Sequence, residues 1–341
     1  MEIKTKRVSK IQRNSTIKNV GNEYYPARSC IVRKENHVTD KAPNIDKCIS
    51  VNCLFSQANK LPMMLIAESG STKTDWRAVD KTGKIEQFTT LGFNPFHQSS
   101  ESIAAEIKQN LLPKLSASVS EVHFYGAGCS SPSMSGIVEK ALNECFNNIE
   151  IHVEHDLLAA ARGLCGHEKG IACILGTGSN SCVFDGKYIT ANIPALGYIL
   201  GDEGSGAYMG KRLMADYIIG LLPEKLAADF AAKSGLDKDK IFEAVYQNPL
   251  PNRFLASFGK FIFQRIEDPY VINLVRNSFV DFFNRYICRY DGYAELPVHF
   301  TGSIAFYFSK ILHDVAAEKH VRVGRIIQSP AAALVLYHTN K

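Results

Sequence analysis

Two stretches of the chain share one pattern of apolar and polar positions: an apolar strand, a turn of small residues and a second apolar strand. The first covers residues 65–79, LIAESGSTKTDWRAV, and the second covers 171–184, IACILGTGSNSCVF. Glycine in such a turn lets the backbone approach a ligand, and the N–H groups of a tight turn can surround phosphate oxygens. Because the hairpin recurs about one domain later, the pattern predicts a duplicated fold with two phosphate-binding turns.

The chain between the hairpins alternates between the two periodicities of regular structure. Hydrophobic spacing predicts a third strand at 85–89, a helix at 99–117, a strand at 121–125, a helix at 134–146 and a strand at 149–153. With the first hairpin, this order describes one α/β unit, in which a mixed sheet packs against helices.

The second half of the chain is richer in helical patterns. Residues 223–291 are expected to be mostly helical, with one wide apolar face that serves as core or dimer contact. A strand at 298–300 leads to a helix at 304–318, and a last helix is expected at 331–338. Ser205 and Ser329 are the expected caps of the helices that follow them.

These elements predict an α/β fold class with two duplicated domains on either side of a nucleotide cleft. The first domain is expected at 63–168 and the second at 169–328. The C-terminal helix, 329–341, is expected to complete the first domain.

The first 62 residues differ from the rest in charge. They hold 12 Lys and Arg against 5 Asp and Glu, whereas the remainder holds 27 against 29, so the formal charge of +5 comes from this segment. The segment is basic, rich in Asn and without sustained periodicity, which predicts disorder. Two interpretations remain: a basic tail for anionic partners, or translation that starts at Met63 or Met64.

Composition excludes several classes of function for the main body. With 45% hydrophobic and 21% charged residues, the chain has the make-up of a globular protein, and the body carries no basic excess for nucleic acid. No apolar run approaches the roughly 20 residues that cross a bilayer. The nine cysteines show no paired spacing, which predicts reduced thiols and a cytoplasmic protein.

The first turn carries candidate groups for ATP and Mg²⁺. Glu68 stands where the first strand ends, and a carboxylate there can hold a hydrated Mg²⁺. Gly70, Ser71, Thr72 and Lys73 are the candidate phosphate ligands of this turn, through N–H groups, hydroxyls and an ammonium. Taken alone, the stretch is equally a plain hairpin.

Three further polar residues stand at turns where ligands of α/β proteins bind. Asp156 follows a strand and precedes a helix, so it is either a plain N-cap or a base that accepts the proton of an attacking hydroxyl. Asn94 is either a turn residue before proline or an amide that binds a sugar hydroxyl. Asp202, within the glycine-rich run 195–206, is a candidate ligand for hydroxyls or an amide.

Four motifs in a fixed order carry a resemblance to a known family. They are ESGSTKTD (68–75), LGTGSN (175–180), GDEGSG (201–206) and TGSIA (301–305). The body resembles the actin-like ATPase superfamily of sugar kinases, which has a ribonuclease H-like fold. Within it, the chain looks most like the BadF/BadG/BcrA/BcrD ATPase family, whose members include N-acetylglucosamine kinase.

The resemblance implies roles for individual residues. It implies that the second turn binds ATP phosphates alongside Thr72 of the first, and that Gly302 and Ser303 border the adenosine. It also implies that Asn94 and Asp202 bind the sugar and that Asp156 is the base. The second-turn residues in this set are Gly176, Thr177, Gly178 and Ser179.

The chain departs from the family at Ala195-Leu196-Gly197, where N-acetylglucosamine kinase has Gly-Trp-Gly. Gly197 is therefore kept as a substrate-binding candidate, but the lost tryptophan leaves the choice of sugar open. The activity that the resemblance implies is ATP-dependent phosphorylation of an amino sugar at its 6-hydroxyl, with Mg²⁺, by a homodimer.

Two rival functions remain from the sequence. Some members of the family are ATP-driven electron-transfer activators that share an iron–sulfur cluster across a dimer, for which Cys129 and Cys165 are the best available thiolates. A sugar-sensing regulator is the third interpretation, although no helix-turn-helix pattern precedes the body.

Overall fold

The computed structural model describes residues 61–70 and 73–340 of the chain. All of these described residues belong to one compact unit, Leu54–Lys341. The expectations for residues 1–60 lie outside the described residues and stay predictions, as do the domain boundaries drawn from the sequence.

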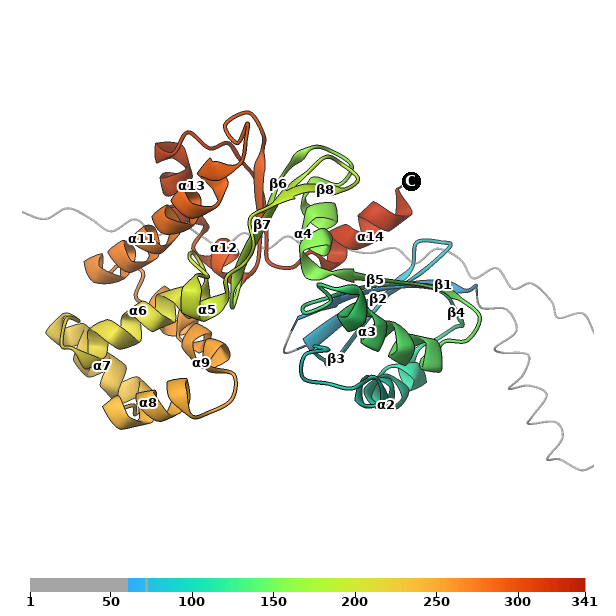
Figure 1. Ribbon diagram of the computed structural model, residues 1–341, viewed down its shortest axis with the longest axis horizontal. Coiled ribbons are helices and arrows are strands. Elements are labelled where there is room, and N and C mark those ends of the chain that lie inside the picture. The colour runs from blue at the N-terminus through green and yellow to red at the C-terminus, as the bar shows by residue number, and fades with distance from the viewer. Residues whose placement is uncertain (1–60, 71–72, 341) are drawn as a thin grey trace, which may run out of the picture. The chain divides into compact units, whose positions relative to one another are not determined.

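The first sheet has five strands in the order β3-β2-β1-β4-β5 (Figure 1). The two outer pairs on one side, β3-β2 and β2-β1, are antiparallel, while β1-β4 and β4-β5 are parallel. Helices α2 and α3 cover one face and enclose an aromatic core of Trp76, Phe93 and Phe124. The elements are β1 (Met63–Ser69), β2 (Lys73–Asp80), β3 (Ile85–Leu91), α2 (Ser100–Asn110), β4 (Val119–Gly126), α3 (Pro132–Cys145) and β5 (Glu150–His155).

The second sheet repeats this topology. Its order is β10-β9-β6-β7-β8, so β6 is central, β7 and β8 are antiparallel additions, and β9 and β10 are parallel additions. The strands are β6 (Gly170–Leu175), β7 (Ser179–Phe184), β8 (Ile189–Asn192), β9 (Val298–Thr301) and β10 (Val323–Ile327). Two sheets with one strand order and one set of directions confirm the predicted α/β fold of the actin-like ATPase type.

The helices of the second half lie mostly between β8 and β9 in the sequence, as predicted for 223–291. Their apolar sides form the largest core, with Phe279, Phe282 and Phe300 fully buried. These helices are α5 (Gly197–Leu200), α6 (Gly206–Ile218), α7 (Glu224–Ser234), α8 (Lys238–Tyr246), α9 (Pro251–Ser257), α10 (Gly259–Phe263) and α11 (Pro269–Arg285), followed after β9 by α12 (Ser303–Tyr307) and α13 (Ser309–Glu318).

Helices α4 (Asp156–Cys165) and α14 (Ala331–Thr339) pack against each other and share a core with both sheets. That core joins Ile66 of β1 to Ala172 of β6 through Ala160 and Leu334. Gly163 of α4 is needed for this contact, because a Cβ there would lie 3.0 Å from the Cβ of Pro330. Helix α14 also contacts β1 and β2, so the end of the chain packs on the first sheet.

The structure corrects two predicted helices and adds two strands that were not predicted. The helix expected over 99–117 ends at Asn110, because Pro113 lacks an N–H and Leu112–Lys114 form a separate 3-10 helix. The helix expected over 304–318 is two helices divided at Phe308, whose side chain is buried in the core. Strands β8 and β10 have too little alternation to be recognised in the sequence.

None of the helices in the described residues is both long and apolar enough to span a membrane.

Candidate active site

Two carboxylates meet where β1 and β5 end. Both strands run parallel to β4, so their carboxyl ends lie at one edge of the sheet. Glu68 is the penultimate residue of β1, and Asp156 follows β5 as the first residue of α4. The plain N-cap interpretation of Asp156 is wrong, because His155 occupies the cap position and makes no side-chain cap bond. The charge of Asp156 nevertheless reaches Glu68.

The environment of these carboxylates favours their protonated forms. The pKa of Glu68 is raised from 4.5 to about 7, first by burial and then by the charges of Asp75 and Asp156, whereas the nearby Lys73 acts to lower it. Burial also raises the pKa of Asp156. Ser329, before α14, donates to Glu68 over 3.4 Å. A buried site where carboxylates lie near one another in this way has the properties of a cation site or of a proton acceptor.

The first turn is closed by a hydrogen bond from the N–H of Gly70 to the carbonyl of Lys73, 3.0 Å long. Lys73 is exposed and pairs with Asp75 at 2.7 Å. The predicted phosphate ligands Ser71 and Thr72 lie outside the described residues.

Asn94 has the structural role that the sequence offered as its plainer alternative. Its Oδ1 accepts a hydrogen bond from the N–H of Phe96 at 3.0 Å, which forms the turn. The same oxygen lies close to the loop after β4, because a Cβ at Gly128 would be 2.7 Å from it. Asn94 therefore shapes its own turn and lies next to the loop after β4.

The second turn is bound to the GDEG loop. Gly176 N–H donates to Gly178 O at 3.0 Å, which closes the turn, and Gly206 N–H donates to Gly176 O at 2.8 Å. The N–H of Ala207 bonds Thr177 O at 3.0 Å. The start of α6, capped by Ser205, is thereby fixed against this turn. The N–H groups at the start of α6 are therefore used within the protein, where they fix the position of the turn.

Asp202 holds a strained backbone position in this loop. Its φ of 62° lies in the left-handed region, where a residue other than glycine is uncommon. Its Oδ1 accepts the N–H of Ser179 at 3.3 Å, and burial raises its pKa. Strain of this kind persists where the surroundings require it, and it is frequent at functional sites.

Glu203 has a larger part in this loop than its sequence position indicated. The side chain is only 3% exposed, accepts a hydrogen bond from Tyr286 Oη at 3.1 Å and pairs with Arg285 at 3.0 Å. The N–H of Gly204 next to it donates to Ser278 at 3.1 Å. Ser278 and Arg285 of α11, together with Tyr286 just after it, therefore hold the loop at three points, which the local sequence around Glu203 could not indicate.

Gly302 lies against the second turn, and Ser303 lies in the wall of a cavity. Gly302 has φ of 115°, and a Cβ there would lie 2.3 Å from the carbonyl oxygen of Leu175 at the end of β6. Ser303 is in the wall of a cavity of about 510 Å³, within the size range of small-ligand sites. The other lining residues are Ala256, Gly259, Lys260, Phe263, Gln264, Ile304, Tyr307 and Phe308.

Two buried hydroxyls around the second turn have no hydrogen-bond partner among the described residues. They belong to Ser179, at the start of β7, and to Thr301, at the end of β9. Buried polar groups are rarely left unsatisfied, so these two are available to a bound ligand.

Gly197 is separate from these groups. It begins α5 with φ of 71°, and a Cβ there would meet open space. The neighbouring Leu196, Ile199 and Leu200 are exposed. The position that carries tryptophan in the resembling family is thus an exposed aliphatic surface here.

Cys129 and Cys165, the candidate cluster thiolates, have different surroundings in the described part of the chain. Cys129 lies near Asp156, whereas Cys165 ends α4 and neighbours Cys173 and Cys182. Burial raises the pKa of each thiol to about 12. Neither is therefore a ready thiolate.

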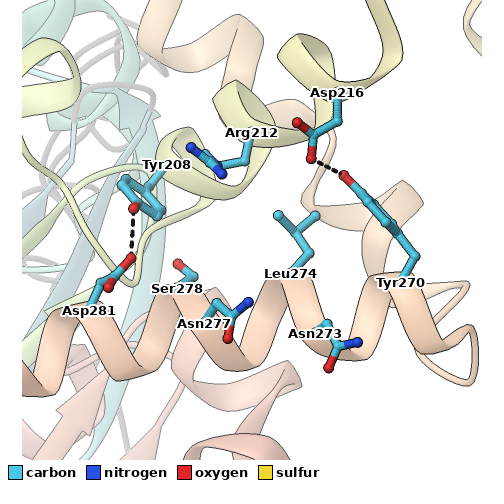
Figure 2. Close-up of a pocket in the computed structure, with 9 residues that line it drawn as sticks. All are labelled: Tyr208, Arg212, Asp216, Tyr270, Asn273, Leu274, Asn277, Ser278 and Asp281. Atoms are coloured by element: carbon cyan, nitrogen blue, oxygen red, sulfur yellow. Dashed lines mark hydrogen bonds between the residues drawn. The ribbon is translucent and has the colours of Figure 1, made fainter. Parts of the chain in front are cut away.

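A second cavity, of about 250 Å³, contains none of the residues chosen from the sequence. Figure 2 shows it between α6 and α11, where Tyr208 donates to Asp281 and Tyr270 donates to Asp216. Arg212 points into the space between these pairs. The cavity meets the GDEG loop through Ser278, which lines it.

Sequence reasoning missed the residues that reach the site from distant parts of the chain. The sequence predicts Ser329 only as a helix cap, and it gives no functional role to Gln264 or Tyr307. Their only sequence signal was a place in helical, apolar surroundings, which most core residues share.

Comparison with protein-family models gives no match, and neither does comparison with curated protein sequences. Among solved structures, a candidate N-acetylglucosamine kinase from Porphyromonas gingivalis is 45% identical, with a TM-score of 0.78; the match covers 82% of this chain and 99% of that one. A candidate N-acetylglucosamine kinase from Chromobacterium violaceum is 20% identical, with a TM-score of 0.60, over 81% of this chain and 99% of that one. At 20% identity the likeness concerns the fold alone.

Proposed function

Because the chain belongs to the same sugar kinase family as the Porphyromonas protein, we propose that it transfers a phosphoryl group from ATP to a hydroxyl of an amino sugar. The observation that carries this proposal is that the carboxylates of Asp156 and Glu68 are near enough at the carboxyl edge of the first sheet for the charge of Asp156 to raise the pKa of Glu68. N-acetylglucosamine or a close relative is the proposed substrate, and its primary 6-hydroxyl the proposed acceptor. The motifs support a finer placement in the BadF/BadG/BcrA/BcrD ATPase family.

The residues present fit ATP and Mg²⁺. Glu68 would hold Mg²⁺ through its carboxylate, since a cation offsets the burial and the like-charge repulsion that together raise its pKa to about 7. The turn 176–179 and the orphaned hydroxyl of Ser179 would contact phosphates. Ser303, in the wall of the largely apolar cavity, and Gly302 next to it in the chain would border the adenosine. When bound, ATP supplies the phosphoryl group and Mg²⁺ neutralises its charge.

Asp156 is the proposed base. Its raised pKa makes it a better proton acceptor than an ordinary aspartate, and its place at the start of α4 fixes its direction. The carboxylate accepts the proton of the sugar hydroxyl while the oxygen forms its bond to phosphorus and the bond to ADP breaks. Asn94, Gly197 and Asp202 are the proposed sugar contacts.

The experiment is the Asp156→Asn variant, measured by ADP release with N-acetylglucosamine, glucosamine, N-acetylmuramic acid and glucose. We expect at least a 100-fold loss of turnover with ATP affinity within threefold of the wild type. Asp314→Asn, at an exposed position on α13, is the matched control and should retain full activity. Turnover above a tenth of the wild-type value in Asp156→Asn would remove Asp156 as the base.

No observation favours the electron-transfer alternative. The homodimer and the cytoplasmic location expected from the sequence stay predictions.

A further inference from the structure

Two neighbouring strands of the first sheet place histidines and glutamates side by side. In the parallel register of β4 and β5, Glu121 lies opposite Glu150 and His123 lies opposite His152. Side chains two residues apart on a strand share a face, so all four project from the same face of the sheet. It is the opposite face from the one where Phe124 packs beneath α2 and α3.

The ligand atoms of this group converge. His123 Nε2 lies 2.7 Å from Glu121 Oε1, and His152 Nε2 lies 3.7 Å from the same oxygen. One ligand atom from each of the three residues lies within 4.8 Å of the other two. Glu150 Oε1 is 3.1 Å from His152 Nε2, which places a fourth donor at the edge of the group.

The His123 nitrogen is an independent sign of a missing ligand. The residue is only 8% exposed, yet its Nε2 has no hydrogen-bond partner among the described residues. Glu121 Oε1 lies 2.7 Å from this nitrogen as an ion-pair contact, but the two make no regular hydrogen bond. A buried ring nitrogen without a partner is costly, and a metal ion would satisfy it.

The separations suit a tetrahedral ion. Bonds of 2.0–2.1 Å from nitrogen and oxygen to zinc put neighbouring ligand atoms about 3.3 Å apart. The observed 2.7 and 3.7 Å bracket that value, so shifts of a few tenths of an ångström suffice for the carboxylate. The two imidazole rings are stacked with an interplanar angle of 7°, and they must tilt so that their lone pairs meet.

We propose that Glu121, His123 and His152 form a binding site for a divalent transition metal ion such as Zn²⁺, with Glu150 as the fourth ligand. Two imidazoles and carboxylate oxygens are a common zinc ligand set. The half-exposed ring of His152 leaves an entry path from solvent.

Residues behind the site hold its buried histidine in place. The ring of His338, from the last turn of α14, stacks on His123 with centroids 3.9 Å apart. His338 Nε2 is 2.8 Å from Tyr125 Oη, which also accepts a hydrogen bond from Arg162 at 2.7 Å. Such supporting contacts orient metal ligands and raise affinity.

This site is separate from the proposed ATP site. Glu121 precedes the end of β4 by five residues and His152 precedes the end of β5 by three. At about 3.3 Å per residue, they lie roughly 10–16 Å along the strands from the carboxyl edge that carries Asp156. The site can therefore be tested without reference to kinase activity.

The test is titration of the chelator-treated full chain with Co²⁺, followed by competition with Zn²⁺. Tetrahedral Co²⁺ absorbs visible light strongly, so the probe reports geometry as well as stoichiometry. We compare the wild type with His152→Gln, at a half-exposed position where loss of folding is not expected, and with His313→Gln, an exposed histidine of α13, as the matched control.

The wild type and His313→Gln should bind one equivalent more than His152→Gln, and Zn²⁺ should displace that equivalent. Glu121→Gln should lower the affinity for this metal ion at least tenfold, and Glu150→Gln should lower it by a smaller factor. Because the difference between variants is measured, binding by cysteines elsewhere does not affect the result. Equal stoichiometry and affinity in wild type and His152→Gln, including no binding in either, would overturn the proposal.

Discussion

The carboxylate of Asp202 accepts a hydrogen bond from the backbone N–H of Ser179 at 3.3 Å, joining the GDEG loop to the second hairpin. The two residues are 23 positions apart in the sequence, and both are buried. The proposed phosphate-binding turn and a proposed sugar ligand therefore depend on one contact. A change in either residue should affect both the stability of the turn and the binding of substrate.

Asp202→Asn and Asp202→Ala should separate these effects. Asparagine tolerates the left-handed backbone and keeps an acceptor for Ser179, so Asp202→Asn should fold normally and raise the KM for the sugar about tenfold or more. Asp202→Ala should also lose about 1–3 kcal/mol of stability, because it leaves the N–H of Ser179 unsatisfied. Chemical denaturation measures the stability of each variant, and steady-state kinetics measure its KM for the sugar. Equal KM values for wild type and Asp202→Asn would contradict a role in sugar binding.

Gly176→Ala should reduce ATP binding without harming the fold. A Cβ at Gly176 would meet no atom within 4 Å, so the protein itself has room for it, whereas a phosphate bound at the turn would be obstructed. We expect at least a tenfold rise in the KM for ATP.

Gly136→Ala is the matched control for that variant, since it also has open space but lies in α3. It should stabilise the protein by about 0.5–1 kcal/mol and leave the KM for ATP unchanged. Calorimetry with ATP and thermal unfolding would check both variants; unaltered ATP affinity in Gly176→Ala would remove Gly176 from the phosphate site.

Stability should depend on pH through Glu68. Its pKa is raised from 4.5 in the unfolded chain to about 7 in the fold, so the folded state binds the proton more tightly. The resulting stabilisation is complete below pH 4.5 and is lost as pH rises from 4.5 to 7, by about 3 kcal/mol at most.

Glu68→Gln should lack this dependence, so its unfolding free energy relative to the wild type should increase between pH 4.5 and pH 7. Urea denaturation in magnesium-free buffer across that range measures the difference. A constant difference between the two proteins would show that Glu68 keeps an ordinary pKa.

Cys129→Ala and Cys165→Ala should retain kinase activity and contain no iron. Both thiols are buried with a pKa of about 12, so neither is poised as a thiolate for a cluster. Activity assays and iron analysis of anaerobically purified protein measure the outcome. Brown protein that loses its iron in either variant would instead favour the electron-transfer function.

The sequence by itself determined the repeated hairpins and the order of the elements around them. Strands such as 65–69 and 171–175 are apolar runs closed by glycine-rich turns, and that signal is local. The expected cap Ser205 is confirmed, since it accepts the N–H of Tyr208, whereas the expected cap Ser329 is wrong, because Pro330 occupies the cap position of α14. The four motifs also led to the sugar kinase family, because each is a short, contiguous stretch.

Only the tertiary structure decided which distant side chains meet. The raised pKa of Glu68 depends on Asp156, 88 residues later in the numbering, and on burial that no local pattern encodes. The convergence of His123 with His152 follows from the parallel register of β4 and β5, since a shift of one residue would turn one ring to the other face. Turns and motifs within short stretches can therefore be predicted from the sequence, whereas strand register and packing are set by contacts between residues far apart in the sequence.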